Sequence, residues 1–295
     1  MKIRFWGVRG SIPTPGPAMA RYGGNTTCIE IRSDDNDLII LDGGSGIYPL
    51  AQALMKELPL VAHIFISHTH WDHIHGLPFF DPLFIPRNEV NIYGGYDVVA
   101  QIGIERALST QFQYSYFPIR EAELKARIRY FTIGAGESVR IGNAKVTPTL
   151  MNHPVLNYGY RVECSGKSVF FTGDHEPHWN IYEPDDEHFQ EYESLINRQE
   201  QIIADGMRDV DLLIADSSYT FEEYPAKKGW GHGTFDSSIR MARLAGARRL
   251  FFTHYVPTRT DAELEAVFAE VLTKYSRESR EVGLNLAMEG RVIEL

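Results

Sequence analysis

Four potential metal ligands fall within six residues of the segment Ser67-His68-Thr69-His70-Trp71-Asp72-His73-Ile74-His75-Gly76, which follows a short apolar, strand-like run. Because side chains at positions i and i+2 of an extended chain point the same way, His68 and His70 can converge on one ion. Asp72 and His73 follow where the chain must turn, and they can face a second ion beside the first. Imidazole nitrogen and carboxylate oxygen are ligands that suit zinc and similar divalent metals. This spacing distinguishes the segment from a polar loop that holds histidines by chance.

Further histidine and aspartate residues stand where other apolar, strand-like runs end. His153, Asp174 and His254 each follow such a run, and Asp42 and Asp216 close two more. Open α/β sheets place their ligand sites at the carboxyl ends of strands. We therefore expect these side chains to share one site with the histidine segment, although each histidine alone would suggest an ordinary loop residue.

The composition is that of a folded domain with an excess of acidic residues. The chain has 295 residues, of which 43% are hydrophobic and 12% aromatic, enough for a sizeable core. Its formal net charge is −10, from 29 basic and 39 acidic residues, whereas nucleic-acid binders usually carry a basic patch. The sequence contains no evident linker or low-complexity segment. We expect one domain over residues 1–295, and we do not expect nucleic acid as a partner.

The sequence offers no signal for a membrane or a secretory pathway. The first six residues lack the long apolar core of a signal peptide, and no apolar run approaches the roughly 20 residues that a membrane helix needs. Cys28 and Cys164 lie far apart in strand-like runs, which predicts buried thiols and not a disulfide. These features predict a cytoplasmic protein that does not bind membranes.

The order of the motifs resembles that of the metallo-β-lactamase-fold hydrolase superfamily. The matching pieces cover nearly the whole chain and comprise His68-x-His70-x-Asp72-His73, His153, Thr172-Gly173-Asp174 and His254. The resemblance is greatest to the phosphodiesterase side, which includes ribonuclease Z, bacterial cyclic-nucleotide phosphodiesterases and the cyclic phosphodiesterases of phosphonate breakdown. It rests on residues 5–11, 22–28 and 41–46 and on Gly231-His232-Gly233-Thr234, in which Gly233 replaces the usual serine.

The resemblance implies an α/β fold, an αββα sandwich with the site at one edge of two sheets. It also implies two divalent metal ions, zinc being the expected metal, with manganese or iron as alternatives. One ion is expected on His68, His70 and His153, and the other on Asp72, His73 and His254, with Asp174 bridging the two. Such a pair of ions produces hydroxide at neutral pH and holds an anionic phosphodiester.

Asp72 and His232 are the candidate catalytic residues. A histidine titrates near neutrality, and His232 lies among glycines that let its ring approach a ligand, so we expect it to protonate the leaving oxygen. Asp216 is expected to orient His232 or another histidine, and Asp42 to support the site backbone or a histidine. Ser217, Ser218 and Tyr219 are weaker candidates for a phosphate contact.

These features together predict a dinuclear metal-dependent phosphodiesterase that hydrolyses a small, cyclic nucleotide by metal-bound hydroxide. One alternative is a ribonuclease Z-like nuclease that trims tRNA, although no basic arm is evident. A second is a hydrolase of another ester, such as a lactone or thioester. A metal-bound sensor without turnover is a third, which the full set of seven ligands disfavours.

Two further segments lead to structural expectations. Residues 97–110 show helical spacing of apolar side chains. Residues 111–118 hold four aromatics within eight residues, which suits a dimer contact, the mouth of the substrate site or ordinary core packing. We expect a homodimer formed through the aromatics between Phe112 and Phe117.

Overall fold

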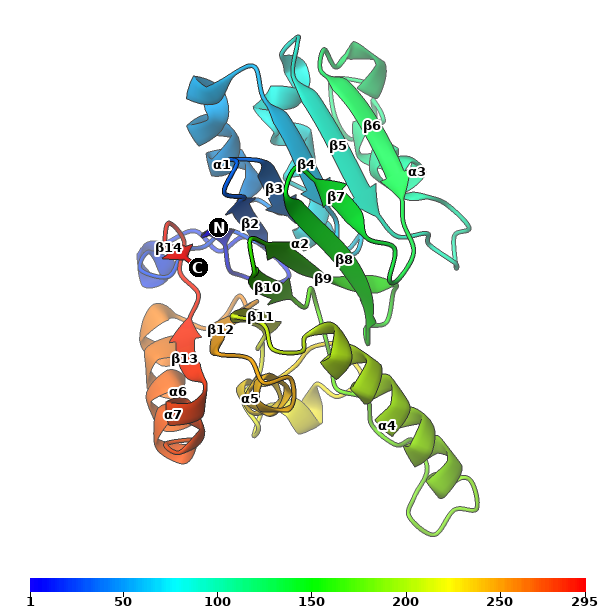
Figure 1. Ribbon diagram of the computed structural model, residues 1–295, viewed down its shortest axis with the longest axis vertical. Coiled ribbons are helices and arrows are strands. Elements are labelled where there is room, and N and C mark those ends of the chain that lie inside the picture. Colours follow the sequence, from blue (N-terminus) through cyan, green and yellow to red (C-terminus); the bar gives the residue numbers. More distant parts are fainter.

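The apolar runs of the sequence form two seven-stranded sheets in the computed structural model, which describes all 295 residues (Figure 1). The first sheet has the strand order β14-β1-β2-β3-β4-β5-β6. Its strands are β1 Lys2–Gly7, β2 Cys28–Arg32, β3 Leu38–Leu41, β4 Val61–Phe65, β5 Glu89–Gly94, β6 Arg127–Thr132 and β14 Val292–Glu294. Strands β1 to β3 pair antiparallel, and β3 to β6 pair parallel.

The second sheet mirrors this division into parallel and antiparallel halves. Its order is β13-β12-β11-β10-β9-β8-β7. The strands are β7 Val139–Ile141, β8 Ala144–Met151, β9 Asn157–Cys164, β10 Lys167–Phe171, β11 Leu212–Asp216, β12 Arg249–Thr253 and β13 Gly283–Leu286. Strands β7 to β10 pair antiparallel, and β10 to β13 pair parallel, so that several loops leave the carboxyl ends of strands at one edge.

Most of the longer helices flank the two sheets on their outer sides, whereas the short helix α2, Trp71–Ile74, lies near the centre of the molecule (Figure 1). Near the first sheet lie α1 Ile47–Leu54, α2 Trp71–Ile74 and α3 Ile104–Ser109. Near the second lie α4 Phe189–Gly206, α5 Phe235–Leu244, α6 Asp261–Lys274 and α7 Glu278–Glu281. The predicted αββα sandwich is therefore confirmed. None of the helices is both long and apolar enough to cross a lipid bilayer.

Aromatic side chains join the two sheets in one core. The rings of Phe5 and Phe251, from β1 and β12, have centroids 5.6 Å apart, and those of Phe65 and Tyr160, from β4 and β9, lie 5.4 Å apart. All four side chains are buried. Each such aromatic pair adds about 0.5–1.5 kcal/mol beyond the burial of its area. Because this core is common to both sheets, we propose that residues 1–295 form one domain.

The helix expected over residues 97–110 is wrong in its first half. Oδ1 of Asp97 accepts hydrogen bonds from the backbone N–H groups of Val99 and Ala100, and Asp97 exchanges backbone hydrogen bonds with Ile102. Short polar side chains that bind nearby backbone in this way compete with a helix. Residues 97–102 therefore form a turn, and α3 begins only at Ile104.

The aromatic segment divides between the core and the surface. Phe112 is buried and packs edge-on against Phe117, with 5.9 Å between the ring centroids. Tyr114 and Tyr116 are 74% and 69% exposed. The two exposed tyrosines are therefore the aromatic side chains of this segment that are most available for the expected dimer contact. Elsewhere, Cys28 and Cys164 are buried free thiols, as predicted.

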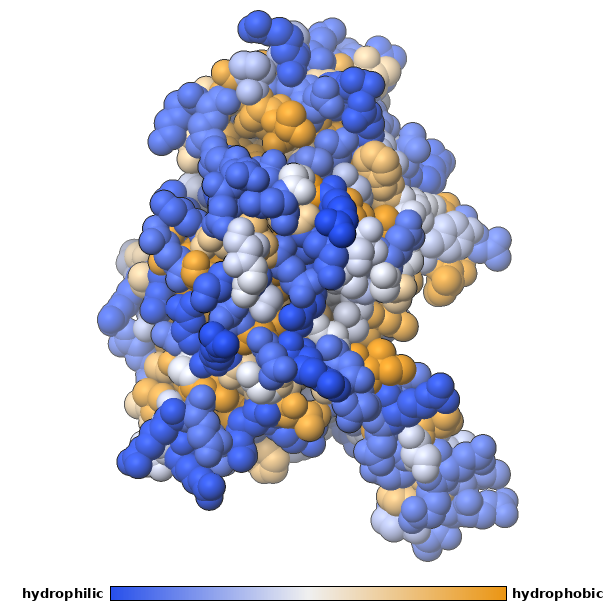
Figure 2. Space-filling view, in the orientation of Figure 1, coloured by the Kyte–Doolittle hydropathy of each residue, from blue (hydrophilic) through white to orange (hydrophobic).

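Helix α4 and the loop before it project from the body of the molecule (Figure 1). We call residues 177–206 the α4 arm. The arm contains a single basic residue of the Lys or Arg type, Arg198, against the acidic residues Glu183, Asp185, Asp186, Glu187, Glu191, Glu193, Glu200 and Asp205. Hydrophilic side chains cover most of this projection (Figure 2). The most protruding element of the protein is therefore strongly acidic.

Candidate metal centre

The ends of strands from both sheets meet at one edge of the sandwich. His68 and His70 follow β4, Asp72 and His73 stand on α2, His153 follows β8, Asp174 follows β10 and His254 follows β12. The structure brings all seven side chains together in two groups that share Asp174, and the potential ligand atoms within each group lie within 4.8 Å of one another. Six of the seven follow strands whose carboxyl ends face the same way in the parallel halves of the sheets, and His153 joins them from the end of β8 in the antiparallel half.

The first group consists of His68, His70, His153 and Asp174. Nε2 of His153 lies 3.1 Å from Nδ1 of His70 and 3.9 Å from Oδ2 of Asp174. Nε2 of His68 lies 3.5 Å from the same carboxylate oxygen. Three imidazole nitrogens thus surround one oxygen of Asp174.

The second group consists of Asp72, His73, His254 and the other oxygen of Asp174. Oδ1 of Asp174 lies 3.1 Å from Nε2 of His73 and 3.1 Å from Nε2 of His254. Oδ2 of Asp72 is 3.1 Å from Nε2 of His254. The two oxygens of Asp174 therefore face different groups, which is the arrangement that a bridging carboxylate requires.

The ligand atoms of the two groups are placed to bind two divalent ions, and two of them make no hydrogen bond within the protein. Nε2 of His68 and Oδ1 of Asp174 are buried and make no hydrogen bond. The Nε2 atoms of His73 and His254 face each other at 3.3 Å. Buried polar atoms normally have hydrogen-bond partners. The two unpaired atoms and the two facing nitrogens therefore fit a site that binds positive ions. Nitrogen and carboxylate donors in these numbers suit zinc, manganese or iron.

Burial and charge divide the histidines of the two groups. Burial lowers the pKa of His68, His70 and His153, so these rings are neutral and present lone pairs. Burial alone would also lower the pKa of His73 and His254, but the Asp174 carboxylate leads the charges that raise both. The second group therefore has the more negative surroundings.

Asp42 supports the second group through a contact with His73. Its Oδ2 lies 2.7 Å from Nδ1 of His73, and its carboxylate accepts hydrogen bonds from both the backbone N–H and the hydroxyl of Ser67. This contact orients Nε2 of His73 toward Asp174. The structure thus places Asp42 against a histidine and the site backbone together.

The N-terminal loop closes the other side of the site. The backbone N–H of Ser11 donates to Oδ2 of Asp72 over 2.7 Å. A Cβ atom at Gly10 would meet the His254 ring at 2.3 Å, so glycine is required for this close approach. The loop therefore positions a carboxylate and an imidazole of the second group.

His232 and Asp216 form a pair beside the two groups. Nδ1 of His232 lies 2.9 Å from Oδ2 of Asp216 and 3.7 Å from Oδ2 of Asp174, and the ring stacks on that of His254. Burial alone would lower the pKa of His232, but the Asp216 carboxylate outweighs it and raises the pKa to about 9. The Asp216 carboxylate therefore favours the protonated form of this imidazole.

Ser217 does not reach the site. Its hydroxyl donates to the carbonyl of Ala215 and lies 2.9 Å from the hydroxyl of Ser238 on α5. Successive side chains of an extended segment point to opposite sides, so the next residue, Ser218, faces the metal centre instead. Its hydroxyl donates to Oδ1 of Asp216 and lies 3.1 Å from Nδ1 of His254.

Glu176 is a positioning residue that the sequence motifs did not reveal. Its buried carboxylate accepts hydrogen bonds from the N–H groups of Gly229 and Gly231 and from the hydroxyl of Tyr224. The carbonyl of Gly231 in turn lies 2.8 Å from Nδ1 of His153. Glu176 therefore fixes the loop that orients His153. Its proximity to Asp174 in sequence was the available signal.

Comparisons with known proteins agree with this fold and site. A family model described as the beta-lactamase superfamily domain matches residues 39–255, and the chain belongs to this family. It is a metal-dependent hydrolase of the metallo-β-lactamase fold. The resemblance inferred from the motifs is thereby confirmed.

The chain is similar over nearly its full length to individual relatives and solved structures. The chain is 26% identical to ribonuclease Z of Thermoplasma volcanium over 313 aligned residues, which cover 94% of this chain and 95% of the relative. Among solved structures, the metallo-β-lactamase fold protein YhfI of Bacillus subtilis aligns with a TM-score of 0.66 at 19% identity, over 100% of this chain and 99% of the other. Unliganded yeast PDE1 aligns with a TM-score of 0.68 at 17% identity, over 100% and 99%. At these identities the two structures establish the fold alone.

Proposed function

We propose that this protein is a dinuclear phosphodiesterase that hydrolyses a small nucleotide, specifically a cyclic one. The observation that carries the proposal is the division of the Asp174 carboxylate between two groups of ligands, next to the pair formed by His232 and Asp216. One such site can bind a phosphate and supply the proton that its leaving oxygen requires.

The two groups of side chains would each hold one divalent ion. His68, His70 and His153 would hold one, and Asp72, His73 and His254 the other, with Asp174 shared. The chemistry that such ions supply is the ionisation of water near neutral pH, together with positive charge for the phosphate oxygens. Zinc is the proposed metal, and manganese or iron would also accept these donors.

His232 would act on the leaving group. Its Nδ1 is engaged by Asp216, so the proton on Nε2 is the one available to an approaching oxygen. The leaving group of a ribose phosphodiester is an alkoxide, which departs slowly without a proton. A protonated imidazole held by a buried carboxylate therefore has the charge and the orientation that this step needs.

The charge of the surface supports a small substrate over a folded RNA. The α4 arm is acidic, and the overall net charge is −10. RNA binding depends on phosphate contacts made by Lys and Arg. The acidic arm would repel a tRNA, whereas a cyclic nucleotide needs only the metal centre.

A ribonuclease Z-like activity on tRNA is the second candidate. It is supported by the relationship to Thermoplasma volcanium ribonuclease Z, which extends over 95% of that protein. Under this alternative the same metal centre would cleave an RNA strand, and RNA would have to bind away from the α4 arm.

A substrate panel distinguishes the two candidates. Purified protein loaded with zinc or manganese is assayed against 2′,3′- and 3′,5′-cyclic nucleotides, bis-p-nitrophenyl phosphate, a precursor tRNA and a lactone. We expect the highest kcat/KM on a cyclic nucleotide. Cleavage of the precursor tRNA with a kcat/KM above that of every cyclic nucleotide would replace the first candidate by the second.

A further inference from the structure

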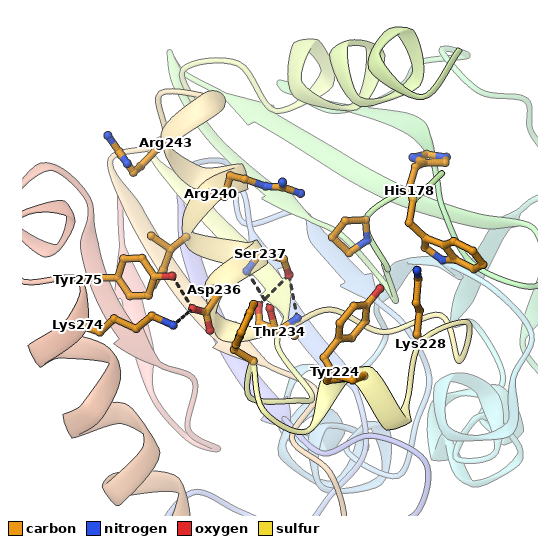
Figure 3. Close-up of a pocket in the computed structure, with 15 residues that line it drawn as sticks. His178, Tyr224, Lys228, Thr234, Asp236, Ser237, Arg240, Arg243, Lys274 and Tyr275 are labelled. Carbon is orange, nitrogen blue, oxygen red and sulfur yellow. Dashed lines mark hydrogen bonds and ion pairs between the residues drawn. The ribbon is translucent and has the colours of Figure 1, made fainter. Parts of the chain in front are cut away.

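A cavity of about 850 Å³ lies beside α5 (Figure 3). Its walls come from one face of α5, from the end of α6, from the loop after β11 and from the first residues of the α4 arm. This volume falls within the range of small-molecule sites, roughly 300–1,000 Å³. None of the seven candidate metal ligands lines it, so the cavity is distinct from the metal centre.

The lining is cationic although the protein is acidic. Four basic side chains line the cavity, Lys228, Arg240, Arg243 and Lys274, and Asp236 is the one acidic residue among them. The chain as a whole carries a net charge of −10. A local excess of positive charge on such a protein favours an anionic ligand, because the surroundings would otherwise repel it.

Two of the four cations are already neutralised within the protein. Lys274 binds the carboxylate of Asp236, which also accepts a hydrogen bond of 2.5 Å from the hydroxyl of Tyr275. Arg243 lies 3.4 Å from Glu278 and 3.6 Å from Glu281. Lys274 and Arg243 are therefore already paired with carboxylates at one end of the cavity.

The other two cations have no carboxylate partner. Neither Arg240 nor Lys228 forms an ion pair, and the Lys228 ammonium lies 3.9 Å from the centre of the Trp179 ring. Figure 3 shows Arg240 reaching from α5 on one side of the cavity and Lys228 on the other side, next to Tyr224. Two cations without ion-pair partners in one cavity favour an anionic ligand such as a phosphate group.

Aromatic rings line the same space. Trp179 and Phe221 are 37% and 62% exposed, and the rings of Tyr224 and Tyr275 also face the cavity. Exposed aromatic side chains beside basic ones are the combination that binds nucleotides, since a base stacks on the ring while its phosphate meets the cation. Stacking of this kind contributes affinity without requiring a particular base.

We propose that this cavity is a binding site for a nucleoside phosphate. The phosphate would be held by Arg240 and Lys228, and the base would stack on the more exposed ring of Phe221. The ligand has two possible sources with the same chemistry, a free mononucleotide and one nucleotide of a short single strand. No metal-centre side chain takes part, so this inference stands apart from the proposed phosphodiesterase activity.

The test is equilibrium binding of AMP to the full-length protein by titration calorimetry. EDTA is included so that metal ions cannot hold the phosphate. Arg240→Ala and Lys228→Ala are each expected to weaken AMP binding about tenfold or more, the usual value of a hydrogen bond to a charged group. Adenosine, which has no phosphate, should bind at least about tenfold more weakly than AMP to the unaltered protein.

Arg140→Ala is the matched control, since Arg140 is an exposed, unpaired arginine on β7, away from the cavity. It should leave AMP affinity unchanged, and circular dichroism should show that every variant is folded. AMP binding that is absent at millimolar concentration, or that Arg240→Ala and Arg140→Ala reduce equally, would overturn the proposal.

A 5′-phosphorylated triadenylate identifies the source of the ligand. Tighter binding than AMP, lost in Arg240→Ala, would assign the cavity to a nucleotide of a strand. Equal or weaker binding would assign it to a free mononucleotide. Triadenylate binding that survives the combined Arg240→Ala and Lys228→Ala changes, with AMP binding too weak to measure in the unaltered protein, would contradict both assignments.

Discussion

Nδ1 of His232 lies 2.9 Å from Oδ2 of Asp216 at the end of β11. The other oxygen of Asp216 accepts a hydrogen bond from the hydroxyl of Ser218, which itself contacts His254. Asp216 thus connects the proposed acid to the second group of metal ligands. A single buried carboxylate fixes the orientation of His232 and stabilises its positive charge.

His232→Ala should retain two metal ions and lose about 10²–10⁴ in kcat on a cyclic nucleotide, the usual worth of a placed general acid. KM should change little, because proton donation to the leaving oxygen acts in the transition state. The loss should be much smaller on bis-p-nitrophenyl phosphate, since p-nitrophenolate departs without a proton. Steady-state kinetics on both substrates measures this, and equal losses would mean that His232 binds phosphate or shapes the loop.

Asp216→Asn should change the pH dependence of kcat. The Asp216 carboxylate raises the pKa of His232, so its removal lowers that pKa. A general acid is active below its pKa, and the basic limb of the kcat profile should therefore move to lower pH. The profile is measured on a cyclic nucleotide with metal saturating at each pH. If the basic limb does not move, Asp216 does not set the pKa of the catalytic acid.

Glu176→Gln should weaken metal binding at the first group. Glutamine keeps the size of the side chain but offers one acceptor oxygen in place of two, so the hydrogen bonds of Gly229 and Gly231 cannot both be kept. Loss of such an indirect support typically costs 10–100-fold in metal affinity or activity. Competition with a chromogenic chelator measures the affinity, and the thermal midpoint of the apoprotein reports on folding.

Glu270→Gln provides the control for that change, because Glu270 is exposed on α6 and makes no ion pair or side-chain hydrogen bond. It should match the parent protein in metal affinity. If the metal affinity of Glu176→Gln also lies within about twofold of the parent value, Glu176 is not needed to orient His153.

The protein should form a homodimer in solution through Tyr114 and Tyr116. Both side chains are largely exposed, and aromatic residues of this kind are enriched at protein interfaces. Light scattering at micromolar concentration should give twice the chain mass of 33.5 kDa, and Tyr114→Ser with Tyr116→Ser should give the chain mass. A monomer before substitution would contradict the interface.

The family resemblance implied the sandwich, whereas the convergence of the metal-centre residues was predicted from local patterns. His68, His153 and His254 all follow apolar strands, and the geometry of parallel strands carries their side chains to one edge. Asp42 and Asp216 were predicted for the same reason. The contact of each with a particular histidine is set by the sheet order, which the pattern does not contain.

The remaining features depend on contacts between distant segments. Glu176 acts through Gly231, which lies on a separate loop, so no local motif marks it. A strand pattern does not show which side of a loop faces inward, so it could not separate Ser218, which faces the metal centre, from Ser217, which does not. Arg240 and Lys228 meet at one cavity only because α5 packs beside the loop after β11. The turn at Asp97 was missed because its side chain replaces helical hydrogen bonds.

The bridging role of Asp174 is tested most directly by counting metal ions. The purified protein, loaded with zinc or manganese and freed of excess metal, is analysed by inductively coupled plasma mass spectrometry beside Asp174→Ala. We predict about two ions per chain in the parent protein and a clear loss in the variant, because Asp174 directs one oxygen to each group of ligands. A saturating value of one ion per chain that Asp174→Ala leaves unchanged would contradict the account.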